Sequence, residues 1–249
     1  MRRPLRFTLY ALLIATATAV AAAVGVQQAR ADWRTASREP VGLAPDPALV
    51  SDAVVQVYGA RTVGAKGVFG VHSWVAAKPS GATQWTVYEV IGWRLGRAPS
   101  VVAVRERAPD GRWFGSAPEL YADRRGPGVD ALIERIEQAA QRYPYAGEYR
   151  AWPGPNSNTF TAWIARAVPE LQVDLPATAI GKDYLGSTIF GAAPSGSGVA
   201  LSLGGLLGVA AGPVDGIEIN LLGLNFGVNA RGLKLPIVGR IGSELQPGS

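Results

Sequence analysis

The chain has 249 residues, of which 48% are hydrophobic and 17% are charged. This length suits one medium-sized domain or two small ones with a conventional hydrophobic core. The chain contains no cysteine and a single histidine, His72. Disulfides, thiolate metal sites, cysteine nucleophiles and zinc sites built from several histidines are therefore excluded.

The net charge of +5 is concentrated at the amino terminus. Four of the 24 basic residues lie in the first 31 positions, where there is no acidic residue, which leaves 20 basic against 19 acidic residues, or +1, in the remainder. A nearly neutral folded part without a dense basic run argues against a nucleic-acid surface. The carboxylates are scattered without metal-ligand spacing, so we expect no metal site, no cofactor and no nucleic-acid partner.

Residues 1–31 have the composition of a signal peptide or a transmembrane anchor. Three arginines precede an uncharged, mostly apolar run from Phe7 to Val26. About 20 apolar residues can cross a bilayer, which favours an anchor, whereas the small residues of Ala29-Arg30-Ala31 favour cleavage. In both cases the rest of the chain is exported. We expect it at the periplasmic face of a bacterial inner membrane, or free in the periplasm after cleavage.

The next 150 residues show strands first and helices afterwards. Residues 32–48 are proline-rich and are expected to be a linker. Short runs rich in Val, Trp and Tyr predict antiparallel strands near 54–58, 70–77, 84–93 and 101–105. Apolar residues at helical spacing predict one helix over 129–143 and a second that contains Phe160, Trp163, Ile164 and Ala167. This order predicts an α+β core over residues 49–180, an antiparallel sheet packed on helices.

Residues 181–249 differ in composition, because they hold 16 of the 31 glycines. Helices are disfavoured there, and strands are expected over 216–222, 225–228 and 233–238. The apolar stretch 199–211 is compatible with a buried loop, a lid or a surface that rests on the membrane; at about 13 residues it is too short to span a bilayer. We expect residues 181–249 to be a glycine-rich β extension of the same domain.

His72 lies within a predicted strand and has a candidate partner on the next one. If the hairpin turns at Ser80-Gly81, paired residue numbers sum to 161 and His72 faces Glu89. Facing side chains in an antiparallel pair share one side of the sheet, so a carboxylate could orient the imidazole as a catalytic base. A loop shifted by one residue would remove this contact. The alternative is a half-buried histidine that Glu89 satisfies without any substrate.

A hydroxyl nucleophile is available at the predicted start of the second helix. Ser157 lies in the sequence Pro155-Asn156-Ser157-Asn158-Thr159, where free backbone N–H groups and the helix dipole favour a developing negative charge. The alternative is that these residues only cap the helix. Asn156 and Asn158, which flank the serine, are included in the predicted substrate-binding set.

Tryptophans complete that set. Trp74 and Trp85 are expected on the same side of the hairpin as His72, and Trp152 is expected to flank it. Tryptophans that line a groove suit sugars or acyl chains, although burial in a core is their commoner role.

These residues resemble a known family. The segments HSW, PGPNSNTF and GLNFGVNARGLKLPIVGRIG are similar to a bacterial exported family catalogued as domain of unknown function 3750, over most of residues 49–242. The order of a histidine on a strand, a carboxylate on the next strand and a helix that starts at NSNTF more distantly resembles circularly permuted papain-like hydrolases of the NlpC type. In those proteins a cysteine occupies the position of Ser157.

The papain-like resemblance implies a permuted papain-like core that hydrolyses or transfers acyl groups, with peptidoglycan peptides and lipids among the substrates. By this resemblance Ser157 is the nucleophile, His72 the base and Glu89 the orienting group. Serine has a far higher pKa than cysteine and must lose its proton during the attack, to a well-aligned neutral histidine. The competing hypothesis is a non-catalytic envelope protein that uses the same groove to bind a glycan, a peptide or a lipid.

Overall fold

The computed structural model describes residues 34–248. The predicted signal peptide or anchor lies outside these residues. Within the described part of the chain, no helix is both long enough and apolar enough to cross a membrane.

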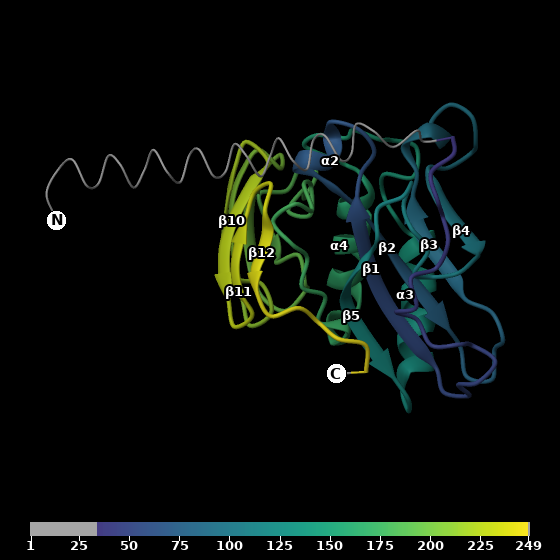
Figure 1. The fold of residues 1–249 in the computed structure, drawn as a ribbon. Helices are drawn as coiled ribbons and strands as arrows, with labels where there is room; N and C mark the ends of the chain where they lie inside the picture. The colour runs from purple at the N-terminus through teal and green to yellow at the C-terminus, as the bar shows by residue number, and fades with distance from the viewer. Residues whose placement is uncertain (1–33, 249) are drawn as a thin grey trace, which may run out of the picture.

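A five-stranded antiparallel sheet forms the centre of the molecule (Figure 1). Its order is β4 (Val102–Glu106), β3 (Thr86–Val90), β2 (Val71–Lys78), β1 (Val54–Arg61) and β5 (Glu119–Arg125). The predicted four-stranded meander is confirmed by β1 to β4. The additional strand β5, which carries four charged residues, pairs with the free side of β1.

Two helices cover one face of this sheet, as the sequence predicts. Helix α3 (Val129–Gln141) buries Ile133 and Ile136, and helix α4 (Ser157–Ala167) buries Phe160 and Ile164. These side chains pack on the odd-numbered residues of β2 in one hydrophobic core. The periodicity of α3 is visible in the sequence because this helix has one buried side, whereas α4 is buried over most of its surface.

The opposite face of the sheet has its own, smaller core. Trp74, Trp85 and Tyr58 are buried there, and Leu43 and Ala44 pack against it. Pro40 also forms an isolated antiparallel bridge to Gly111. The described part of the proline-rich segment that we expected to be a linker therefore lies against the sheet, where its apolar side chains are removed from water.

The glycine-rich region forms a second antiparallel sheet, with α4 between the two sheets in Figure 1. Its strands follow one another in order: β6 (Phe190–Ala192), β7 (Val199–Leu203), β8 (Leu207–Gly212), β9 (Gly216–Leu221), β10 (Leu224–Asn229), β11 (Gly232–Leu235) and β12 (Gly239–Gly242). The predicted strands of this region are confirmed. Residues 199–211 form the hairpin β7–β8, so the buried-loop and lid interpretations are wrong.

Buried ion pairs connect the second sheet to the loops that follow α4. Glu218 on β9 pairs with Lys182 and Lys234, and Lys234 also pairs with Asp174 at 2.6 Å. Arg240 on β12 pairs with the other oxygen of Asp174. These groups face the body of the molecule, so the inner side of the second sheet is held by charges rather than by an aliphatic core.

Short segments complete the described chain. Helix α2 (Lys66–Phe69) lies between β1 and β2, and two single turns of 3-10 helix cover Gly92–Arg94 and Pro169–Leu171. The carboxyl-terminal residues return to the first sheet, where Gly248 N donates to Asp123 Oδ2 at 2.8 Å. The ends of β1, β2 and β3 that lie near α2 border the pocket described next.

Candidate active site

A pocket of about 870 Å³ opens where β1 and β3 end and β2 begins. Most of its lining is apolar and aromatic, and it includes Trp93, Trp113 and Trp152. The polar or ionisable groups that reach it include His72, Lys66 and the first residues of α4. A large apolar cavity with a few polar groups at one place is the usual form of a small-molecule site.

His72 and Glu89 meet in this region, although the register that we predicted is wrong. The structure pairs Val75 with Tyr88 and Ala77 with Thr86, so paired numbers sum to 163 rather than 161. A shift of two residues keeps every side chain on its face of the sheet, and Glu89 becomes a diagonal neighbour of His72. The His72 Nε2 to Glu89 Oε2 distance is 2.9 Å. The predicted contact between His72 and Glu89 is therefore present, but the two residues are diagonal neighbours rather than directly opposite each other.

Two arginines that the sequence analysis missed also hold Glu89. Arg105 Nη2 lies 2.6 Å and Arg107 Nε lies 3.5 Å from Glu89 Oε1. Burial alone would raise the pKa of Glu89, but His72 and the two arginines lower it to about 2. The alternating Arg105-Glu106-Arg107 pattern, where the strand after Glu89 ends, is the signal that could have indicated these partners.

The His72 ring is buried and is held in one orientation. It stacks on Trp113 with the ring centroids 3.6 Å apart. Burial, the largest influence, lowers the pKa of His72 below its ordinary value despite the opposing effect of Glu89. Because Glu89 is ionised, Nε2 carries the proton and donates, which leaves Nδ1 as the acceptor of a neutral imidazole. This is the protonation state that a general base needs.

Ser157 is the first residue of α4 and borders the same pocket. The helix cap is Asn156 rather than Ser157, since Asn156 Oδ1 accepts from the N–H groups of Asn158 and Thr159. Within the described residues, neither the hydroxyl nor the backbone N–H of Ser157 has a hydrogen-bond partner. A free N–H at a helix start is a suitable donor to a developing oxyanion.

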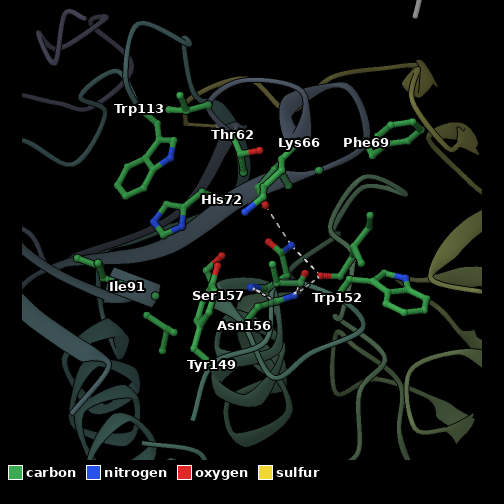
Figure 2. A pocket seen from close by; sticks show the side chains of 18 of the residues that line it. Thr62, Lys66, Phe69, His72, Ile91, Trp113, Tyr149, Trp152, Asn156 and Ser157 are labelled. Atoms are coloured by element: carbon green, nitrogen blue, oxygen red, sulfur yellow. Dashed lines mark hydrogen bonds between the residues drawn. The ribbon is translucent and has the colours of Figure 1, made fainter. Parts of the chain in front are cut away.

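Two of the three predicted catalytic residues, His72 and Ser157, approach the pocket from different layers. Ser73, the neighbour of His72, donates from its hydroxyl to Asn158 Oδ1 at 2.9 Å and so points toward α4. The His72 side chain therefore leaves the opposite face of β2. It still reaches the pocket because it is the second residue of the strand, at the end of the sheet. Figure 2 shows His72 near the end of α4 that carries Ser157. Among the described residues, no hydrogen bond joins the imidazole to the Ser157 hydroxyl.

The predicted substrate-binding residues fall into two groups. Trp74 and Trp85 are buried in the small core and do not line this pocket. Trp152, Asn156 and Asn158 line it. The amides of both asparagines donate to the Ile180 carbonyl, so they shape the wall rather than offer free donors.

Trp152 stays half exposed at the rim. Its Nε1 donates to Leu222 O at 3.0 Å. A Cβ at Gly223 would lie 2.5 Å from that nitrogen. Glycine is therefore required beside this ring.

The structure adds two lining residues that no sequence pattern indicated. Lys66 extends from α2 into the pocket in Figure 2, and Tyr149 lies on the opposite wall. Lys66 lies in a four-residue helix and Tyr149 in an irregular segment, and neither segment is long and regular enough for periodicity to carry information. Among residues 34–248, no three His, Asp or Glu side chains are grouped so that they could hold a metal ion.

Comparison with known proteins gives one match. The sequence model of a family described as "Protein of unknown function (DUF3750)" matches residues 52–184, which include β1 to β5, both long helices and the pocket's polar residues. No curated protein and no solved structure matches the chain.

Proposed function

The chain belongs to the DUF3750 family, and on the chemistry of its own pocket we propose that it is a cell-envelope hydrolase or acyltransferase that acts on an amide or ester bond. One observation supports this most directly: an oriented, neutral histidine and a serine at a helix start border one apolar pocket. The order of these groups along the chain is also that of the permuted papain-like hydrolases, to which the sequence is similar.

The reaction assigns one task to each group. The Ser157 hydroxyl attacks the substrate carbonyl carbon while its proton moves to His72 Nδ1. The carbonyl oxygen becomes an oxyanion, which accepts from the Ser157 N–H. The tetrahedral intermediate collapses, and the leaving amine or alcohol takes the proton from His72. Water then hydrolyses the acyl-serine, or a second amine or alcohol accepts the acyl group. The mechanism requires the Ser157 hydroxyl to come within hydrogen-bond reach of Nδ1 when substrate fills the pocket.

A serine-directed fluorophosphonate tests this assignment. We expect the full-length protein to be labelled covalently and Ser157→Ala to lose the label completely, as measured by intact-protein mass spectrometry. Ser187→Ala is the matched control, because Ser187 is exposed and outside the pocket, and it should label like the parent protein. Labelling that survives in Ser157→Ala would remove Ser157 from the mechanism.

The pH dependence of labelling tests the role of His72. Only the neutral imidazole can accept the serine proton, and burial lowers the pKa of His72 below its ordinary value of 6.5. The labelling rate should therefore be level around pH 7 and should fall as the pH decreases through the pKa of His72, below pH 6.5. A rate that begins to fall above pH 7 would show that another group is the base.

A second candidate function is binding without catalysis. The missing hydrogen bond between Ser157 and His72, and the origin of the two side chains on different layers, favour it. This candidate predicts no fluorophosphonate label on any variant. It also predicts equal affinity of the parent protein and Ser157→Ala for a long-chain fatty acid, measured by the quenching of tryptophan fluorescence by a nitroxide-labelled analogue.

A further inference from the structure

The second sheet has its apolar and polar sides reversed. From β7 to β11, every side chain on the outward face is Leu, Ile, Val, Phe or Ala. The inward face of the same strands carries the polar residues Ser202, Glu218, Asn220, Asn225 and Lys234, all buried. An antiparallel sheet with one face in water normally shows the opposite pattern. The outward face is therefore built to contact something other than water.

The outward side chains form continuous rows across the strands. Val209 pairs with Ile219, and Ile219 pairs with Phe226; their exposures are 52%, 46% and 42%. A parallel row contains Leu207, Leu221 and Leu224, which are also exposed. Among residues 34–248, nothing covers these rows. An uninterrupted apolar surface of this kind marks an interaction site.

We propose that this outward face, the strands β7 to β11, lies on the acyl region of a lipid bilayer. The residues that precede the described chain favour a bilayer as the occupant. The uncharged run Phe7–Val26 has the length of a membrane span, and only 13 residues (27–39) separate it from Pro40, which is fixed beside Gly111. Thirteen residues reach at most about 45 Å when fully extended. A retained anchor would therefore hold Pro40 within about 45 Å of the membrane and keep the whole domain beside the bilayer.

The pocket gives a second reason for a lipid surface. Leu224 belongs both to the outward face and to the pocket lining, and Leu222 and Trp152 lie at the same border. A half-exposed tryptophan at such a border suits a membrane interface, because its ring is apolar and its N–H is polar. An apolar chain could pass from the bilayer into the pocket without crossing water. A second copy of the protein stacked on this face would instead cover Leu224.

The absence of cysteine from the sequence allows one probe to be placed on the face of the full-length protein. Ile219→Cys is labelled with a nitrobenzoxadiazole fluorophore, and the protein is reconstituted into phosphatidylcholine vesicles with or without nitroxide-labelled acyl chains. We expect the nitroxide lipids to quench most of the Ile219→Cys fluorescence. A probe at Glu134→Cys, exposed on α3, should be unaffected. Because the face carries no charge, quenching should be unchanged in 1 M salt, which distinguishes apolar contact from attraction to headgroups.

A second variant removes the contact without removing the anchor. Val209→Asp and Phe226→Asp are added to the labelled Ile219→Cys protein; both sites are exposed, so the thermal unfolding midpoint should stay close to that of the parent. Lipid quenching should then be lost although the protein still sediments with vesicles. Quenching by a water-soluble quencher but not by lipid would overturn the proposal. A probe shielded from both quenchers would show that protein covers the face, and would overturn it as well.

Discussion

Replacing Glu218 by alanine should destabilise the protein by about 3–5 kcal/mol, the range for removing one partner of a buried ion pair. Glu218 is 3% exposed and is the only carboxylate among the described residues that pairs with Lys182. Burial alone would raise the pKa of Glu218, yet Lys182 and Lys234 hold it below its ordinary value. Without Glu218, Lys182 stays buried with no carboxylate in ion-pair contact and only the weaker electrostatic interaction with Asp215.

Urea unfolding measured by circular dichroism checks this expectation. Glu134→Ala is the matched control, because that glutamate is exposed, and it should change the free energy of unfolding by less than about 0.5 kcal/mol. Adding Lys182→Met to Glu218→Ala should recover part of the lost stability, since the unpaired charge is removed with its partner. Equal stability of Glu218→Ala and the control would show that the network is not buried in solution.

Replacing Glu89 by glutamine should lower the free energy of unfolding by a similar amount. It should also change how that free energy depends on pH in the acid range. The side chain is fully buried and faces His72, Arg105 and Arg107. Because the folded-state pKa of Glu89 is about 2, below its ordinary value of 4.5, its stabilising contribution is complete above pH 4.5 and is lost as the pH falls toward 2. A pKa difference of this size between the folded and unfolded states corresponds to about 3 kcal/mol of folding stability.

The difference between the parent and Glu89→Gln isolates this contribution. Free energies of unfolding are measured by urea titration at several pH values from 7 to 3. The parent should be more stable by about 3 kcal/mol near neutral pH, and the gap should narrow as the pH decreases below 4.5. Glu106→Gln, which lies between the two arginines in the sequence but is exposed, should show no such convergence. A constant gap at all pH values would contradict the lowered pKa.

The sequence predicts elements well where apolar residues recur at the spacing of a helix or gather in short runs typical of strands. Helices α3 and α4 were found from apolar spacing, and the strands β1 to β4 from short runs of Val, Trp and Tyr. Strand β5 was missed because charged residues obscure its alternation: Asp123 faces Gln56 and Arg125 in a buried polar contact. In the reversed second sheet, the strands β9 to β11 were predicted, since alternation has the same period whichever side is buried, whereas β6, β7, β8 and β12 were not. Which side faces water was not predictable from the period.

The candidate site likewise combines features that the sequence predicts with features that it does not. A register shift by an even number of residues leaves every side chain on the same side of the sheet. The prediction that His72 and Glu89 share one side therefore holds although the register differs by two residues. Trp74 and Trp85 were correctly placed on the His72 side. Their burial was not predicted, because it depends on residues 43–44 and 113 packing over them.

The order of β1 to β4, α3 and α4, the absence of thiol chemistry, and the side of the sheet that His72 shares with Glu89 can all be predicted from the sequence. These follow from local periodicity and residue chemistry. Three features depend on the folded arrangement: Ser157 and His72 reach one pocket from different layers, two arginines hold Glu89, and the second sheet is polar inside and apolar outside. Such features depend on how distant segments stack, and stacking is set by the total burial of the folded chain rather than by any one stretch of it.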